Sequence, residues 1–145
     1  MQIKIPQNKI EFSLYYDFRW KELRKSFGEP LGSEKDNLEG ESHHLMLVEK
    51  EKVVGVGRIH FIIKSSTKKA QIRYMAINKK YQRKGYGSVL LLELEKIASE
   101  NNITSIFLHA RERAVSFYIK NNYYKNKKSH LLFGSVQHWL MDKKI

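Results

Sequence analysis

The chain has 145 residues, enough for one domain with a single hydrophobic core, and it has no cysteine, which excludes disulfides, thiolate metal ligands and cysteine nucleophiles. Its net charge of +12 is uneven: residues 1–51 carry 8 basic and 10 acidic residues, whereas residues 52–145 carry 19 and 5. This excess indicates either an anionic partner (a nucleic acid, a membrane surface or a polyphosphate cofactor) or a lysine-rich surface that keeps the protein soluble.

The first half of the chain is expected to form one helix, one long loop and three strands. An amphipathic helix is predicted over 14–27, with an apolar side formed by Leu14, Tyr15, Phe18, Leu23 and Phe27. Residues 28–42, with three glycines, a proline and five acidic residues, are the clearest loop, and their length hints at a substrate-side position. Residues 43–49, 53–64 and 70–77 are typical of strands joined by short turns. They predict an antiparallel meander.

The second half alternates between helices and strands. An apolar stripe predicts a helix over about 86–101, followed by a strand over 103–110 and a helix over 111–122. A short strand at 123–126 and a last one at 131–142 complete the pattern. We therefore expect an α/β (α+β) fold in which helices flank a central mixed, mostly antiparallel sheet, with residues 1–145 forming a single domain.

The segment YQRKGYGS at 81–88 joins the third predicted strand to the next helix. Gly85 and Gly87 allow a close backbone approach where that helix begins, and Ser88 can cap it or donate a hydroxyl. Unpaired N–H groups and the helix dipole make such a turn attractive to a phosphate, and Arg83 and Lys84 add positive charge. The spacing excludes a Walker loop and weakens a dinucleotide fingerprint, since Leu90 stands where a third glycine is needed.

The order of the motifs is similar to that of one enzyme family. Gln82–Gly87 reads Q-x-x-G-x-G, follows YMAI and precedes an apolar helix, which resembles motif A of the GNAT acyltransferase superfamily. The downstream segment LHARERAVSFYIKNNYY also resembles that family, and the likeness covers most of residues 45–141. It implies a GNAT-like fold and an acetyl-CoA or other acyl-CoA cosubstrate, with no metal.

The resemblance also implies roles for particular residues. The pantetheine arm would run along the backbone of Met75, Ala76 and Ile77. The pyrophosphate would rest on the loop formed by Gln82, Arg83, Lys84, Gly85, Tyr86, Gly87 and Ser88. Tyr118 matches the tyrosine that protonates the CoA thiolate in many members. Arg111 stands where many members have an asparagine that contacts the cofactor arm, so a guanidinium there reaches either the CoA phosphates or the acceptor.

The base that takes the proton of an amine acceptor is left open. Family members often have a carboxylate on the strand before motif A, but no acid lies between Glu51 and Glu93. The candidates are His60, His138, Glu39 and Glu41. Arg73 indicates an acceptor with a carboxylate or phosphate, or else points to solvent.

These observations predict an acetyl-CoA-dependent N-acetyltransferase in which an amine, on a small molecule or a protein, attacks the thioester directly. The alternatives are a catalytically inactive acyl-CoA-binding domain and, less favoured, a basic nucleic-acid-binding module. The N-terminus lacks the apolar segment of a secretory signal and no apolar run is long enough to span a bilayer, so a cytoplasmic protein without a membrane partner is expected. A homodimer is possible, as in many family members.

Overall fold

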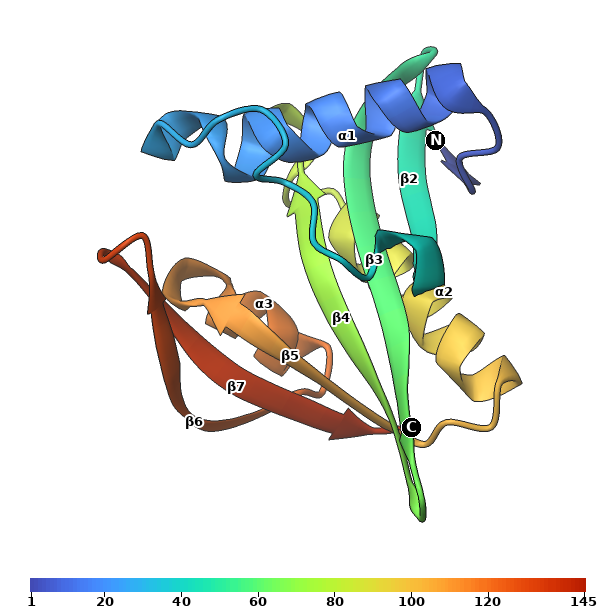
Figure 1. Ribbon diagram of the computed structural model, residues 1–145, viewed down its shortest axis with the longest axis vertical. Coiled ribbons are helices and arrows are strands. Elements are labelled where there is room, and N and C mark those ends of the chain that lie inside the picture. The colour runs from blue at the N-terminus through green and yellow to red at the C-terminus, as the bar shows by residue number, and fades with distance from the viewer. The chain divides into compact units, whose positions relative to one another are not determined.

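The computed structural model describes residues 1–145 as two compact units. Unit 1 comprises residues 1–60 and 74–94, and unit 2 comprises residues 61–73 and 95–145. The strands hydrogen-bond in the order β1-β2-β3-β4-β5-β7-β6 (Figure 1). Their bounds are β1 Gln2–Lys4, β2 His43–Glu49, β3 Lys52–Lys64, β4 Thr67–Ile77, β5 Ser105–Arg111, β6 Tyr124–Leu132 and β7 Val136–Lys144; the helices are α1 Lys9–Leu23, α2 Tyr86–Glu100 and α3 Val115–Lys120. Because β4 pairs with β5 in parallel and the other described pairs are antiparallel, the predicted mixed, mostly antiparallel sheet with flanking helices is confirmed.

In unit 1, α1 lies along one face of β2 and β3 (Figure 1). It begins at Lys9, five residues before the predicted start, because the Asn8 side chain accepts a hydrogen bond from the Glu11 N–H and caps it. Tyr15 and Phe18 are buried against the strands, whereas Leu14, predicted on the apolar side, is 52% exposed. The predicted apolar side is therefore confirmed at Tyr15, Phe18 and Leu23, which are buried, and wrong at Leu14.

Strands β2 and β3 form a hairpin whose turn residues, Lys50 and Glu51, both have positive φ, as a tight hairpin requires. The predicted boundaries of these strands hold to within a residue. Strand β1 was not predicted, since three residues are too few for a recognisable pattern; it pairs with β2 from Gln2↔Val48 to Lys4↔Met46.

Two β3 glycines lie where the strand meets large apolar side chains. A Cβ on Gly57 would lie 2.9 Å from Cδ1 of Leu94 and 3.4 Å from Cδ2 of Leu90, both on α2 and both fully buried. A Cβ on Gly55 would lie 2.8 Å from Cδ1 of Ile77. The absence of a side chain at these positions therefore lets α2 and the end of β4 pack closely on β3.

We expect Gly57→Ala to lower the free energy of unfolding by about 1–3 kcal/mol, because the new methyl group overpacks a filled core. Urea denaturation followed by circular dichroism measures this. Gly40→Ala is the matched control: nothing lies within 4 Å of its Cβ position, so it should stay within about 0.5 kcal/mol of the original protein. Equal stability of the two variants would mean that Leu94 moves aside at no cost.

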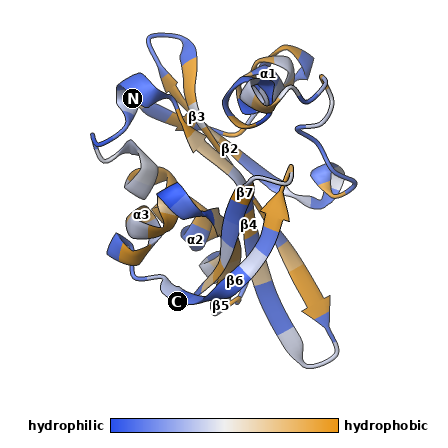
Figure 2. Cartoon of the chain, turned by 90° about the vertical axis from the view of Figure 1, so that its left-hand side faces the viewer, coloured by the Kyte–Doolittle hydropathy of each residue, from blue (hydrophilic) through white to orange (hydrophobic).

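In unit 2, Ala70–Ile72 of β4 pair with Ile106–Leu108 of β5, and β5 pairs along its length with β7. The predicted helix over 111–122 is shorter: a 3-10 turn at Glu112–Ala114 leads into α3, and Arg111 is the last residue of β5. The last two strands also differ from the prediction, because β6 continues to Leu132 and the turn falls at Phe133 and Gly134, both with positive φ. The lysine-rich part of β6 is hydrophilic and its end is hydrophobic, which explains why the pattern predicts two separate strands, 123–126 and 131–142, with a break between them (Figure 2).

The sheet of unit 2 has two different faces. On the core face lie the buried side chains of Ile106, Leu108, Ala110 and Met141. Tyr123, next to α3, also belongs to this side, since its hydroxyl donates to Glu95, which binds the core-face Lys143. The opposite face, here called the histidine face, carries Phe107, His109 and Arg111 from β5 and His138 and Leu140 from β7.

Candidate active site

The loop between β4 and α2 folds back onto the end of β4. The Asn78 N–H donates to the Val54 carbonyl at 2.8 Å, and the Asn78 side chain accepts from the Lys80 N–H at 2.9 Å. The Gln82 side-chain amide donates to the Ile77 carbonyl at 2.9 Å. Gln82, one of the predicted cofactor residues, thus uses its side chain to hold the shape of the loop.

Gly85 marks the start of α2. Its φ of +84° lies in the left-handed region that glycine adopts without strain, and no atom lies within 4 Å of where a Cβ would stand. Its carbonyl accepts from the Val89 N–H at 3.1 Å. The N–H groups of Tyr86, Gly87 and Ser88 lie in the first turn, where a helix provides no acceptors. An anion can therefore approach this turn closely and meet the positive end of the helix dipole.

Basic and aromatic side chains accompany this turn. Four exposed basic residues belong to the loop: Lys79, Lys80, Arg83 and Lys84. The rings of Tyr81 and Tyr86 stack at 5.8 Å, and Lys84 Nζ lies 5.5 Å from the centre of the Tyr81 ring. The Tyr86 hydroxyl donates to Glu49 at 3.1 Å, and burial together with that carboxylate raises the pKa of Tyr86. Tyr86 therefore anchors the first turn of α2, while the cations stay accessible.

The end of β4 leads into this loop through an unusual residue. Tyr74 has φ +57°, rare for a residue with a side chain and typical of a local irregularity in a strand. Its ring is contacted by three guanidinium groups, with carbon-to-centroid distances of 4.3 Å for Arg19, 4.9 Å for Arg58 and 5.5 Å for Arg24. The residues that follow, Met75–Ile77, are partly exposed. The segment Met75–Ile77, predicted to bind the pantetheine arm, therefore follows a bend at Tyr74 whose ring is held by three arginines.

A buried charge cluster in unit 1 was not predicted. Arg58 on β3 is fully buried and donates to Asp36 at 2.6 Å and 3.0 Å and to Glu39 at 2.8 Å. Burial opposes the charged form, but the two carboxylates outweigh it and raise the pKa of Arg58. The long acidic loop of residues 28–42 is thus held to β3 by one side chain. In the sequence, the feature that could have indicated a buried arginine is the single Arg58 within the apolar run VVGVGRIHFII.

A second buried arginine extends this cluster to α1. Arg19 donates to Glu39 at 2.9 Å and to the Tyr15 hydroxyl at 2.6 Å. Because His44 Nε2 lies 2.8 Å from the Glu39 carbonyl, it must carry the proton, and Tyr15 donates to His44 Nδ1 at 2.8 Å. Burial lowers the pKa of His44 and raises that of Tyr15. Both groups therefore stay neutral in a fixed chain of hydrogen bonds.

Three of the four candidate bases lie in unit 1. Glu39 accepts hydrogen bonds at both carboxylate oxygens, from Arg19 and Tyr16 at one and from Arg58 and the Asp36 N–H at the other. His60 Nδ1 lies 3.4 Å from the Arg58 guanidinium, which can only donate. Glu41 is exposed on the 3-10 turn Glu39–Glu41. The Arg58 guanidinium thus lies against both Glu39 and His60 and occupies acceptor atoms that a base would use.

Unit 2 contains the two remaining predicted site residues, Tyr118 and Arg111. Tyr118 lies on α3, is 7% exposed and meets the rings of Phe117 and Tyr123 edge-on at 5.0 Å and 5.7 Å. Burial raises the pKa of Tyr118 well above its ordinary value, and no charged neighbour contributes. Its hydroxyl is therefore protonated at neutral pH and able to act as a proton donor.

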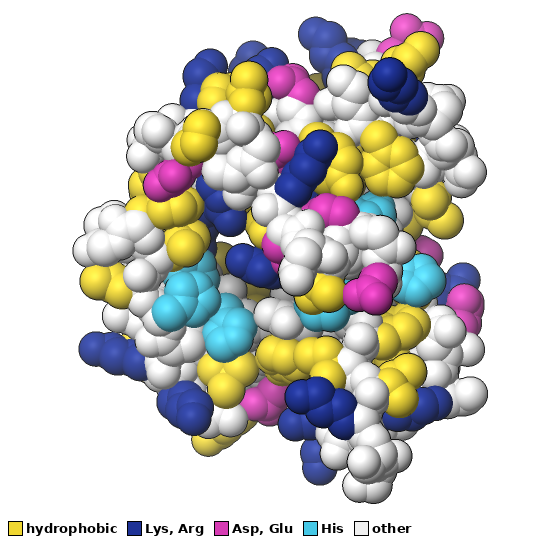
Figure 3. All heavy atoms as spheres, viewed as in Figure 1, with side chains coloured by type: hydrophobic (Ala, Val, Ile, Leu, Met, Phe, Trp, Pro, Cys, Tyr) yellow, Lys and Arg dark blue, Asp and Glu magenta, His cyan; other side chains and the backbone are white.

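Three histidines gather on the histidine face of unit 2. The rings of His138 and His130 stack at 4.4 Å with an angle of 19°, and His109 lies 5.3 Å from His130. Figure 3 shows histidine side chains grouped over β5, β6 and β7. His138 Nδ1 lies 3.0 Å from the Val136 carbonyl and therefore carries a proton, which leaves Nε2 as the basic nitrogen of the neutral ring. Of the two candidate histidines, His60 directs Nδ1 toward an arginine, whereas the contact with Val136 leaves Nε2 as the acceptor atom of His138.

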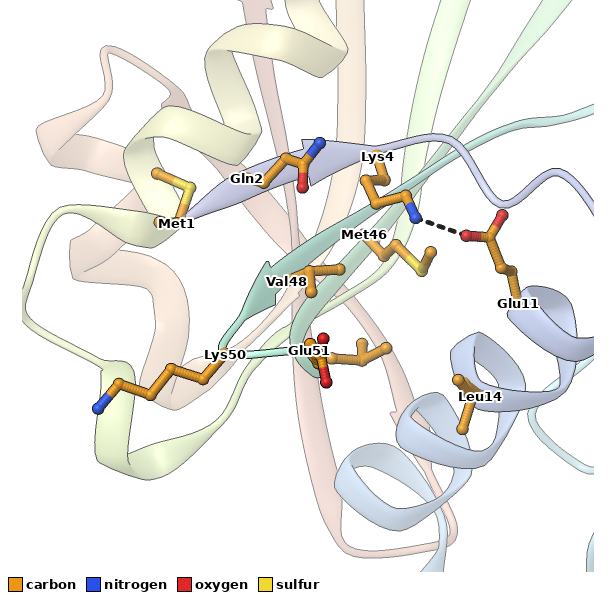
Figure 4. A pocket seen from close by; sticks show the side chains of 10 residues that line it. Met1, Gln2, Lys4, Glu11, Leu14, Met46, Val48, Lys50 and Glu51 are labelled. Carbon is orange, nitrogen blue, oxygen red and sulfur yellow. Dashed lines mark hydrogen bonds and ion pairs between the residues drawn. The ribbon is translucent and has the colours of Figure 1, made fainter.

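A hollow of about 450 Å³ lies elsewhere in unit 1, between β1, the β2–β3 hairpin and α1 (Figure 4). Its lining includes Leu14, Met46 and the ion pair of Lys4 with Glu11, whose charged atoms are 2.6 Å apart. None of the predicted cofactor residues lines it. The hollow is therefore separate from the loop that carries the anion-binding features.

None of the helices has the length and apolar character needed to cross a bilayer.

Comparisons with known proteins agree with this arrangement. The model of the Acetyltransferase (GNAT) family matches residues 12–123. A protein named "Uncharacterized N-acetyltransferase YjcF", from Bacillus subtilis (strain 168), is 28% identical over 143 residues, covering 99% of each chain. Another from the same organism, "Uncharacterized protein YyaT", is 30% identical over 110 residues, covering 76% of this chain and 71% of the relative.

Solved structures with the same fold include proteins crystallised with the cofactor. An aminoglycoside 6'-N-acetyltransferase complexed with coenzyme A has a TM-score of 0.79 at 15% identity, covering 99% of this chain and 97% of that one. The PaiA N-acetyltransferase of Thermoplasma acidophilum, also in complex with coenzyme A, has a TM-score of 0.68 at 18% identity, with full coverage of both chains. An acyl-CoA N-acyltransferase from Pseudomonas aeruginosa has a TM-score of 0.80 at 17% identity, covering 98% and 97%.

Proposed function

Since this chain belongs to the GNAT acetyltransferase family and is an N-acetyltransferase, we propose that it transfers the acetyl group of acetyl-CoA directly to an amine acceptor, with the β4–α2 loop binding the donor. The observation that carries the proposal is the geometry at Gly85. An unstrained left-handed glycine with open space beside it precedes three first-turn N–H groups in a loop with four exposed cations. This suits a pyrophosphate.

The donor would lie along the residues that the sequence indicated. The backbone of Met75, Ala76 and Ile77 would bond the pantetheine arm, and the first turn of α2 would hold the pyrophosphate with Arg83 and Lys84. Gln82 and Tyr86 would act through the shape of the loop, because their side chains bond Ile77 and Glu49. The role of the protein at the donor is thus to orient it and to offset its charge.

In the reaction, the neutral amine attacks the thioester carbonyl, a C–N bond forms and the C–S bond breaks. The departing CoA thiolate takes a proton from Tyr118, and the nitrogen loses a proton to a base. We propose His138 for that base, because the Val136 carbonyl fixes its tautomer with Nε2 unprotonated. Tyr118 packs against Tyr123 and His138 lies on the histidine face, so the two side chains do not contact each other, and the bound donor and acceptor would have to reach both.

Acetyl transfer is tested by the release of free CoA thiol from acetyl-CoA in the presence of a panel of small amines and lysine peptides, with product acetylation checked by mass spectrometry. Transfer to at least one amine class is expected. Acetyl-CoA binding without thiol release across the panel would instead favour an inactive acyl-CoA-binding domain. Salt-sensitive nucleic-acid binding without CoA binding would contradict both the acetyltransferase and the acyl-CoA-binding domain.

Tyr118→Phe should lower kcat by about 100-fold, the lower end of what a general acid contributes, and leave acetyl-CoA affinity unchanged. The substitution removes only the hydroxyl, and the ring contacts with Phe117 and Tyr123 remain. Tyr124→Phe, at a 67% exposed position of the same unit, is the control and should keep full turnover. Stopped-flow thiol detection gives kcat, and calorimetry gives affinity. An unchanged kcat would remove Tyr118 as the acid.

Several broader expectations are part of the same proposal. Residues 1–145 would act as a single acyltransferase domain in the cytoplasm, without a metal and without nucleic acid as a partner. A homodimer also stays a prediction. Sedimentation velocity at several protein concentrations addresses the oligomeric state directly.

A further inference from the structure

The histidine face of unit 2 gathers basic groups from four strands. The register Arg111↔His138 places the guanidinium and the imidazole side by side on the same face. His109 stands two residues before Arg111 on β5, and His130 on β6 lies between the other two rings, 4.4 Å and 5.3 Å away. Arg73 on β4 belongs to the same unit, and its charge acts on His109.

Arg111 and Arg73 are cations, and the three histidines add positive charge only when they are protonated. Burial and then the charges of His130 and Arg73 lower the pKa of His109. Burial lowers the pKa of His138, although the bond to the Val136 carbonyl offsets part of this effect. The charges of His130, Arg111 and His109 lower the pKa of His138 further. The acid on this face, Asp142, pairs with Phe107 in register and accepts from Asn126 at 3.1 Å. An anion bound among these groups would interact favourably with Arg111 and would favour protonation of the histidine rings.

The three histidines also differ in accessibility in a way that suits a ligand. His138 is 6% exposed, His109 is half-buried and His130 is exposed. His109 Nδ1 is buried without a hydrogen-bond partner, so the proton of the neutral ring belongs on Nε2, because an N–H buried without an acceptor is costly. His109 thus offers one donor when neutral, and each ring offers two when protonated.

We infer that the three histidines and Arg111 bind an anionic group, a carboxylate or a phosphate, carried by the acceptor amine. This rests on the proposed function, whose substrate class it narrows: the acceptor is an amine that also bears an acid. The anion would accept hydrogen bonds from the Arg111 guanidinium and the imidazoles. It would also favour the imidazolium that His138 becomes on taking the proton of the amine.

The experiment uses the full-length chain, labelled with ¹⁵N, and follows the histidine ring signals by NMR at pH 6.5. The probes are inorganic phosphate and succinate, each compared with sodium chloride at equal ionic strength. We expect saturable shifts of the His109, His130 and His138 signals with at least one probe. His43, exposed on β2 in unit 1, serves as the internal control and should not shift. Preference for phosphate or succinate tells which acid the acceptor carries.

Arg111→Gln and, separately, His130→Gln should each weaken that binding at least tenfold, while Lys120→Gln, an exposed substitution in the same unit, should not change it. The absence of a saturable shift, or displacement of the bound probe by CoA, would overturn the inference, since displacement would assign the cluster to the donor. Release of CoA with neutral amines is measured in parallel. Thiol release without anion binding would support the proposed acetyl transfer and refute the acidic acceptor. Anion binding without any acetyl transfer would support the anion site and refute the proposed acetyl transfer.

Discussion

Gly85→Asp should abolish acetyl-CoA binding, with a loss of at least 1,000-fold in affinity. The new carboxylate would stand where no atom now lies within 4 Å, at the first turn of α2. A negative charge about 4 Å from a phosphate costs about 4 kcal/mol at an effective dielectric constant of 20, close to three powers of ten in the dissociation constant. Isothermal titration calorimetry with acetyl-CoA measures the effect directly.

Two controls separate charge from strain. Gly85→Asn places a side chain of the same size without charge, and asparagine tolerates the φ of +84° better than most residues, so a loss of only about tenfold is expected. Gly32→Asp introduces the same acid at another glycine with positive φ and open space, and it should bind acetyl-CoA normally. Equal losses in the Asp and Asn variants of Gly85 would show that shape matters there and charge does not, which contradicts a pyrophosphate site.

Arg58→Met should be the most destabilising single change, lowering the free energy of unfolding by about 3–5 kcal/mol. The substitution removes three charge-assisted hydrogen bonds to Asp36 and Glu39 and leaves their carboxylates, 17% and 14% exposed, without that cation. It also frees the acidic loop from β3. Urea denaturation monitored by circular dichroism gives the change.

Lys21→Met provides the contrast. Lys21 pairs with Asp17 at 2.9 Å on the surface of α1, with both side chains about half exposed, and such a pair contributes less than about 1 kcal/mol. A loss for Arg58→Met as small as that for Lys21→Met would mean that the buried cluster relaxes or takes up water. The loop of residues 28–42 would then be held by Arg19, Arg24 and His44, which also bond to it.

Local patterns were sufficient for most of the fold. The alternation in residues 43–77 and the apolar stripe of residues 86–101 arise from burial on one face of a strand or helix, and the structure has β2, β3, β4 and α2 there. The end strands were harder: β1 is three residues long, and β6 carries lysines whose polarity hides its pairing with β7. Edge strands bury little, so composition carries a weak signal for them.

Residue types at fixed local spacing were sufficient to predict the family, the glycine turn at the start of α2 and the placement of Tyr118 on a helix. Which charges meet depends on how the chain folds. Arg58 lies 22 residues from Asp36 and 19 residues from Glu39 in the chain, and the three histidines come from three strands. Contacts of this kind depend on sheet register and loop path, which no short window of sequence encodes. Local patterns therefore predicted a donor loop and named Arg111 and His138 singly, whereas their grouping with His109 and His130 follows from the pairing of β5, β6 and β7.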